Sequence, residues 1–358
     1  MSFGRCMWIL VFLVVSVRGE DSCDAQEIGK WICPDLFVLG SELSGIMYIT
    51  EVLARSLDGR IRLPDEGVRG ETCGGRLRCE YGTQYFSWDH QKGLAWYRES
   101  YGIRNSTEEV GLEVNPQYLA LPSVPFRMQS ELLPSRLRFI VSFRDPVARA
   151  HAAYRSSIIS IASGSSRIHN AYAVFDFKFS LIARTVGDYV RGCTQLLSDP
   201  KHVYIMCAHE SAIDQYRNYH ASVPETEKRI TDFQLIARPF TSGLYGYIMT
   251  RWFEKFEPEQ FCPLMYENLL EDFEAEIMNL EHCLEAFGAT LKGHDYADLK
   301  IIPDPDGCEQ CEHFEQLDEE EMAEVGQQLN EKIFGASNDI LSELMEAYYG
   351  RRDIGKWT

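Results

Sequence analysis

The sequence predicts an α/β protein in which a central, mostly parallel sheet is flanked by helices. Its short apolar runs are typical of strands that are buried on both faces. Between and after these runs, apolar residues recur at helical spacing. Strands that alternate with helices favour a parallel sheet covered in three layers. The expected strands are 35–40, 79–86, 137–143, 202–207 and 260–266, and the expected helices are 45–57, 145–159, 241–256, 269–288 and one or two more within 318–345.

The N-terminal end predicts a secretory signal peptide over residues 1–19. Arg5 precedes an apolar stretch of about eleven residues, 7–17, and small residues near Gly19 suit cleavage. A membrane-spanning helix needs roughly 20 apolar residues, so this stretch is short for a permanent anchor. An uncleaved signal-anchor is the alternative. Either way we expect the protein in the secretory pathway, in the Golgi lumen or outside the cell.

The cysteines fit an oxidising compartment. The chain has 11 cysteines, of which Cys6 leaves with the signal peptide. Cys308 and Cys311 alone do not make a zinc site, because zinc would need a second nearby pair of Cys or His residues. A disulfide is therefore favoured for this pair, and no metal is expected. The sequon at Asn105 predicts an exposed, glycosylated loop. Locally plausible disulfide pairs are Cys23/Cys33, Cys73/Cys79 and Cys308/Cys311.

The net charge of −19 argues against nucleic acid and other polyanions as partners. Between Asp304 and Glu331 there are 11 acidic residues and no Lys or Arg, which indicates a solvated acidic segment. A neutral or weakly charged partner therefore suits the protein better than a highly sulfated one. The least regular stretch, 163–242, is either an insertion or a lid over a site.

The stretch DLFVLGSELSGIMYIT, residues 35–50, runs from an expected strand through a glycine-containing turn into an expected helix. Many proteins build a phosphate cradle in this way. Gly40, Ser44 and Gly45 permit a tight turn whose N–H groups bind an anion. No Lys, Arg or Thr stands inside the turn, and Glu42 adds a negative charge beside it.

A second candidate follows the expected strand at 137–143, where Arg144, Asp145 and Pro146 begin a helix. Pro146 suits the first helical turn and Asp145 can cap it. Arg144 therefore stands at the carboxyl end of a strand. Its guanidinium either grips a phosphate or pairs with a neighbouring carboxylate.

The motif that begins at Arg144 resembles the 3′-phosphate-binding motif of Golgi carbohydrate sulfotransferases, especially the heparan sulfate type. It reads Arg-Asp-Pro-Val-x-Arg-Ala-x-x-x-Tyr after a strand. Three further stretches resemble the same family in the same order, and the matches run from Leu36 to about Leu341. The turn after the first strand then falls where the family keeps its 5′-phosphosulfate loop. These stretches are TQYFSWDHQKGLAWYRESY, SGLYGYIMTRWFEKFEPEQFCPLMYENLLEDFEAEIMNLEHCLEAFG and LNEKIFGASNDI.

The resemblance implies one P-loop-like α/β domain at 20–346, followed by a tail at 347–358. It also implies binding of 3′-phosphoadenosine 5′-phosphosulfate (PAPS) as co-substrate and transfer of sulfuryl to a carbohydrate hydroxyl, without a metal. Such transfer needs an anion cradle, a cation for the leaving phosphate and a base for the acceptor hydroxyl. The residues implied in donor binding are Gly40, Ser41, Leu43, Ser44, Gly45, Ile46 and Arg144.

Several positions depart from the family. The loop lysine is replaced by Leu43 and the following Thr or Ser by Ile46, and losing one charged donor typically costs about 3–4 kcal/mol of transition-state stabilisation. The strand glutamate of the family falls on Gly82. Glu80 lies two residues earlier on the same face of the expected strand, about 6.6 Å away, and is the candidate base. His90 is a second, weaker candidate.

The remaining charged residues allow partial compensation. Arg78 shares the strand face of Glu80 and either replaces the missing cation or is an ordinary edge charge. The helix serine of the 3′-phosphate site is Ala152, where Arg149 and Arg155 lie nearby. Residues 302–311 are acidic and contain no Lys-Gly-Arg loop.

Two hypotheses remain open. The first is an active, divergent sulfotransferase of the secretory pathway. The second is a non-catalytic protein on the same fold that binds a glycan or protein partner.

Overall fold

The computed structural model describes residues 29–57, 60–65, 82–162, 178–196, 237–285 and 317–357. Several sequence predictions fall outside these residues: the signal peptide, Arg78, Glu80, the expected strand at 202–207, most of the predicted insertion and the first part of the acidic segment, 304–316. They stay predictions.

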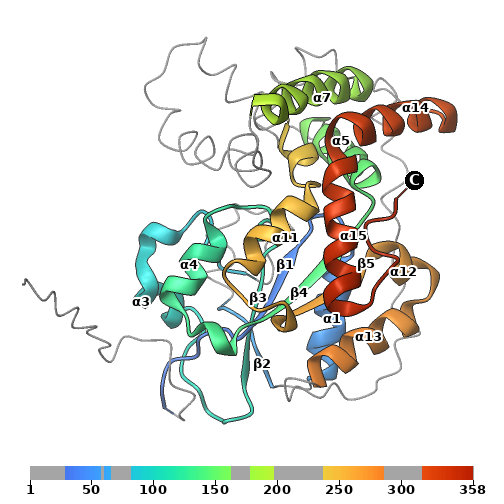
Figure 1. Ribbon diagram of the computed structural model, residues 1–358. Helices are drawn as coiled ribbons and strands as arrows, with labels where there is room; N and C mark the ends of the chain where they lie inside the picture. The colour runs from blue at the N-terminus through green and yellow to red at the C-terminus, as the bar shows by residue number, and fades with distance from the viewer. Residues whose placement is uncertain are drawn as a thin grey trace, which may run out of the picture.

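Five strands, all parallel, form one sheet in the order β2-β3-β1-β4-β5 (Figure 1). The predicted α/β class is therefore confirmed. From β1 the chain first builds one side of the sheet and then crosses to the other, so the strand order reverses at β1. In such sheets ligands bind beyond the carboxyl ends of the strands at the point of reversal. The strands are β1 Leu36–Gly40, β2 Ile61–Arg62, β3 Val110–Val114, β4 Arg138–Phe143 and β5 Phe261–Met265.

Helices cover both faces of the sheet, because the strand side chains alternate between two apolar cores. Phe37 and Phe139 point into the larger core, and Leu36 and Ile140 point into the smaller one. The larger core is covered by α3 Gly93–Glu99, α4 Val124–Glu131, α5 Pro146–Ala162, α7 Phe179–Leu196, α11 Tyr245–Phe253, α14 Glu319–Leu329 and α15 Gly335–Tyr349. The smaller core is covered by α1 Ile46–Ser56, α12 Tyr266–Glu271 and α13 Phe273–Glu285.

The expected strand at 79–86 is wrong over its described part. Residues 82–84 are irregular and 85–88 form turns. The sheet instead contains β2 and β3, which the sequence did not predict. The argument that Glu80 and Gly82 share one strand face therefore loses its basis.

A disulfide between Cys262 and Cys283 joins β5 to α13. It is not one of the predicted pairs. Cys33 is also disulfide-bonded, whereas the predicted pairs Cys73/Cys79 and Cys308/Cys311 lie outside the described residues.

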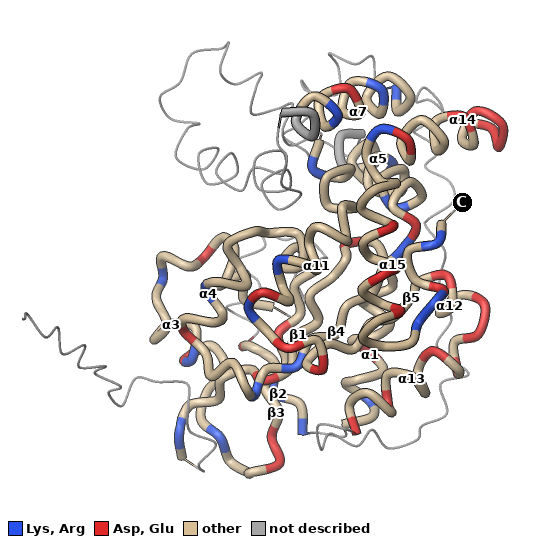
Figure 2. Tube along the Cα trace, in the orientation of Figure 1, with Lys and Arg blue, Asp and Glu red and all other residues tan. Residues whose placement is uncertain are grey.

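Acidic residues are concentrated on α14, as the red part of the tube in Figure 2 shows, and Asp318 caps this helix by accepting a hydrogen bond from the N–H of Glu321. Among the described residues, no helix combines the length and the apolar composition that a membrane crossing requires.

Candidate anion-binding site

The turn between β1 and α1, residues 40–46, is a tight loop that depends on its glycines. We call it the cradle. Gly40 has a φ of 132°, and a Cβ at this position would lie 2.5 Å from the carbonyl oxygen of Pro116. Gly45 has a φ of 75° and precedes the first turn of α1. Glycine alone adopts such angles readily and leaves room for the neighbouring backbone. The predicted tight turn is therefore confirmed.

Serine hydroxyls fix the cradle to the neighbouring elements. Ser41 Oγ lies 2.5 Å from Ser44 Oγ and 3.0 Å from the hydroxyl of Tyr245 on α11. Ser142 on β4 donates from its Oγ to the Ser44 carbonyl at 2.5 Å, and its own carbonyl accepts from the Ser41 N–H at 2.8 Å. All three serines are buried, so the loop is held from β4 and α11 at once.

Arg144 reaches the cradle from the end of β4. Its Nη1 donates to the Leu43 carbonyl at 2.8 Å, and its guanidinium carbon lies 4.5 Å from the centre of the Tyr266 ring. The residue is only 8% exposed, so its charge is directed toward the loop rather than toward bulk water. The two candidates that the sequence offered separately, the turn and the strand-end arginine, therefore form one site.

Asp145 acts as the predicted cap of α5. Its Oδ1 accepts from the Ala148 N–H at 2.8 Å, and its own N–H donates to Glu267 Oε1 at 2.8 Å. Burial raises the pKa of Asp145 and of Glu267. The Glu267 carboxylate thereby holds the turn that orients Arg144.

A second guanidinium lies near Tyr245, the residue whose hydroxyl contacts the cradle. Arg149 is 1% exposed, donates from Nη2 to the Pro239 carbonyl, and lies 6.0 Å from the centre of the Tyr245 ring. Burial raises the pKa of Tyr245, and the charge of Arg149 opposes that rise. Ala152, at the family's serine position, is buried, and Arg155 is half-buried. Of the two arginines that the sequence offered for compensation, Arg149 is the one that the Tyr245 contact connects to the cradle.

The region around Gly82, where the resemblance implies the base for the acceptor hydroxyl, is packed more tightly than that base allows. A Cβ at Gly82 would lie 2.2 Å from the Val114 carbonyl oxygen and 3.4 Å from Glu113 Oε1. No side chain fits at that distance from a backbone atom. The glutamate that the resemblance implies is therefore excluded at this position by packing.

Sequence reasoning missed Glu113, a buried acid on β3 beside Gly82. It accepts hydrogen bonds from the N–H and Oγ1 of Thr83 at 3.0 Å each, from the Tyr118 hydroxyl at 2.9 Å and from the Tyr101 hydroxyl. Burial raises its pKa to about 7, although these four hydrogen bonds work against the rise. The signal in the sequence was a single glutamate inside an apolar run, VGLEV. Glu113 has no exposure to solvent. It therefore holds the 82–86 segment in place and is not accessible to the hydroxyl of an acceptor substrate.

His90, the second candidate base, is held away from the cradle. Its Nε2 lies 2.5 Å from Glu131 Oε1 on α4, and its ring centre lies 5.3 Å from that of Tyr85. Neither of these two partners belongs to the cradle. The structure therefore unites the seven predicted donor-binding residues but does not bring His90 to them.

No metal site is evident in the described part of the chain, where no three His, Cys, Asp or Glu side chains cluster suitably.

No family model matches the chain, and no characterised protein matches its sequence. The solved structures that are similar to it include two sulfotransferases. A sulfotransferase from Alicyclobacillus acidocaldarius shows 16% identity and a TM-score of 0.45, over 91% of this chain and 98% of that chain. The sulfotransferase domain from the curacin biosynthetic pathway shows 12% identity and a TM-score of 0.38, over 88% and 98%. At such low values, the functional assignment rests on the residues of the site.

Proposed function

We propose that the protein belongs to the sulfotransferase class and that its cradle binds a sulfuryl-donor nucleotide, PAPS or its product 3′-phosphoadenosine 5′-phosphate (PAP). One observation carries this proposal: Arg144 donates to the Leu43 carbonyl and so brings a cation to a loop that has lost its lysine. A guanidinium suits phosphate and sulfate oxygens. The first N–H groups of α1 add the positive end of the helix dipole.

The cradle residues fit an anion in part. Gly40, Gly45 and the buried serines give the loop shape, and Arg144 gives one charge. Glu42 is half-buried beside them and opposes an anion. We therefore expect donor affinity below that of a site with a loop lysine.

We propose a carbohydrate hydroxyl in the secretory pathway as the acceptor. The Cys262–Cys283 disulfide supports an oxidising compartment, and Asn105 of the sequon is exposed as glycosylation requires. The net charge of −19 favours a neutral or weakly charged glycan over a sulfated one.

A second candidate function, a non-catalytic glycan- or protein-binding module, is favoured by the acceptor side. The base position is closed at Gly82, and Glu113 is locked in a buried network. In that case the nucleotide site would serve binding or stability and not transfer.

Thermal stability in the presence of PAP tests donor binding in both cases. A ligand at about 100 times its dissociation constant adds roughly 2.7 kcal/mol to the unfolding free energy. We expect an increase in Tm with millimolar PAP, and the absence of any shift would contradict the proposed site. Transfer of labelled sulfate from PAPS to a panel of neutral glycans then separates the candidates, because only the first predicts a labelled product.

A further inference from the structure

Residues 350–357, which follow α15, fold back toward the sheet and form what we call the C-terminal strap. Gly350 ends α15 with a φ of 65°, and the N–H groups of Gly350 and Arg351 donate to the Glu346 and Met345 carbonyls. This capping pattern reverses the chain direction after the helix. The strap then crosses toward the carboxyl end of β5.

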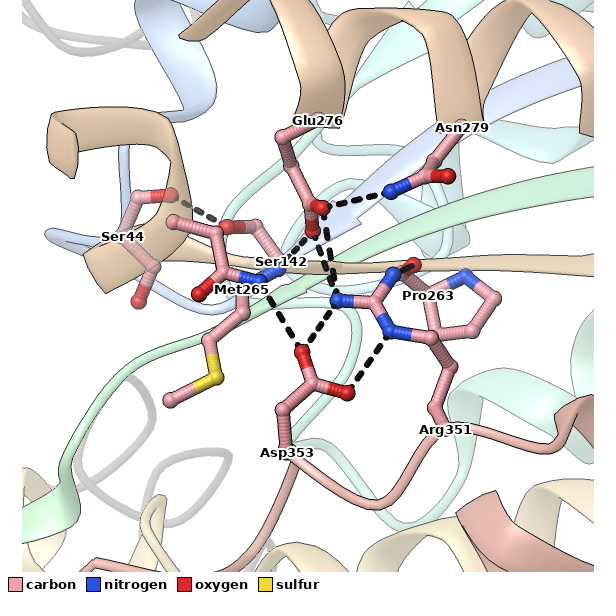
Figure 3. A network of polar contacts seen from close by, with 9 residues as sticks. Ser44, Ser142, Pro263, Met265, Glu276, Asn279, Arg351 and Asp353 are labelled. Carbon is pink, nitrogen blue, oxygen red and sulfur yellow. Dashed lines mark hydrogen bonds and ion pairs between the residues drawn. The ribbon is translucent and has the colours of Figure 1, made fainter. Parts of the chain in front are cut away.

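A buried ion pair anchors the strap. Arg351 Nη2 lies 3.1 Å from Oε1 of Glu276, which is 2% exposed, and 2.6 Å from Oδ2 of Asp353 (Figure 3). Glu276 Oε1 also accepts from the Met265 N–H at 2.6 Å, at the end of β5. The hydrogen bond from Arg351 lowers the pKa of Asp353 to about 2. The strap is therefore fixed to the edge of the sheet at which the cradle lies.

Packing continues the anchor toward the C-terminus. Ile354 is fully buried, and Gly355 has a φ of 89°. A Cβ at Gly355 would lie 2.9 Å from both the Asn338 carbonyl oxygen and the Ser342 nitrogen on α15. These contacts restrict the backbone of the strap two residues before Trp357.

Trp357 lies against the aromatic residue that holds the cradle. Its ring centre is 5.9 Å from that of Tyr245, whose hydroxyl contacts Ser41 of the cradle. The indole N–H of Trp357 is buried and has no hydrogen-bond partner among the described residues. The contact of Trp357 with the site is therefore its ring packing on Tyr245.

We infer that Trp357 is a positioning residue for donor binding, which acts through Tyr245 and keeps the cradle in the geometry that an anion requires. The identity of the anion rests on the proposed function, whereas the effect of Trp357 on the loop does not. In Trp357→Ala, the ring of Tyr245 loses this neighbour, so its hydroxyl and Ser41 become free to move.

Two measurements on the full chain test this inference. Titration with PAP is expected to show affinity weakened at least about tenfold in Trp357→Ala, since small misplacements of a binding group are costly. Hydrogen exchange of the 40–46 backbone is expected to accelerate in the same variant. Trp357→Phe keeps a ring on Tyr245 and should stay within about threefold of the wild type in affinity, at well under 1.4 kcal/mol.

Met128→Ala is the matched control for lost stability. Met128 is fully buried on α4, and the hydrogen bonds that hold the cradle and the strap do not involve it. Its truncation should lower the Tm without altering loop exchange or PAP affinity. Unchanged loop exchange in Trp357→Ala would overturn the inference, whether or not PAP binds. A different result is also informative: the wild-type protein does not bind PAP, but loop exchange is faster in Trp357→Ala. This result would contradict the proposed function and support the positioning role.

Discussion

The cradle after β1 and the 82–86 segment have each lost a charged residue that the sulfotransferase resemblance implies, but the two losses differ in kind. In the cradle the backbone keeps its shape, and Leu43 is half-buried with a φ of 64°. At Gly82 the missing side chain has no room, because the Val114 carbonyl occupies its place. In the cradle only the side chain differs from what the resemblance implies, whereas at Gly82 the surrounding packing differs as well.

This difference separates donor binding from acceptor activation. Arg144 and the serine network hold the cradle that we propose as the anion-binding site. On the acceptor side, the nearest acid is Glu113, which is enclosed by Thr83, Tyr101 and Tyr118. Under the proposed function, the donor half of the site is retained, whereas the core fills the half that would activate the acceptor.

Restoring the glutamate at Gly82 is expected to have the largest effect. Overpacking typically costs about 1–3 kcal/mol, and a second carboxylate beside buried Glu113 adds repulsion, so Gly82→Glu should lower the unfolding free energy by more than about 3 kcal/mol. Chemical denaturation measures this. Gly192→Ala on α7, where a Cβ meets nothing within 4 Å, is the control and should stabilise the protein. Full stability of Gly82→Glu would contradict the packing account.

The buried Glu113 predicts a pH dependence of stability. Its pKa is raised from 4.5 to about 7, so the folded state keeps its proton to higher pH than the unfolded chain. The unfolding free energy should therefore fall between about pH 4.5 and 7, by about 3 kcal/mol at 1.36 kcal/mol per pKa unit, and then level off. Glu113→Gln has no such proton to lose, and the comparison of its pH profile with the wild type isolates this group. Parallel profiles would show that Glu113 is ionised throughout.

The next largest effect is expected from removing the arginine at the cradle, which should weaken donor binding. A hydrogen bond to a charged group contributes about 1.5–3 kcal/mol, so Arg144→Ala should reduce PAP affinity roughly 10- to 100-fold. Arg155→Ala removes an equal charge from α5 and should change affinity by less than about threefold. Equal losses in the two variants would indicate a general electrostatic effect and not a specific contact.

Returning a lysine to the cradle is expected to have the smallest effect. Leu43→Lys introduces the missing cation at a position whose backbone already exists, so PAP affinity should rise by about fivefold, near 1 kcal/mol. The measurement is a titration at low and moderate salt, because a charge contribution weakens as salt increases. Leu43→Met controls for the change in side-chain shape.

The sequence predicted those parts of the fold that local pattern determines. β1, β4 and β5 and the helices after β1 and β4 were recognised from apolar runs and helical spacing, and the pairing of β1 with β4 brings Gly40 and Arg144 to one edge. β3 was missed because Glu113 interrupts its apolar run, and the stabilisation of that acid by Tyr101 and Tyr118 is a tertiary property.

Other features depend on contacts that no local pattern specifies. The segment at 82–86 was predicted as a strand from its aromatic residues, but Tyr85 and Phe86 serve ring packing against Tyr97 and Tyr118 and not sheet pairing. The Cys262–Cys283 disulfide joins residues that are 21 positions apart. The role of Trp357 depends equally on the return of the strap to Tyr245, which only the folded chain shows.

The most direct test of the central claim is one calorimetric titration series with PAP on wild type, Arg144→Ala and Leu43→Lys. If the cradle still binds the donor nucleotide through Arg144, affinity should be highest in Leu43→Lys, intermediate in the wild type and lowest in Arg144→Ala. Equal affinities in the three proteins, or no binding by any of them at millimolar PAP, would contradict the claim that the donor half of the site survives.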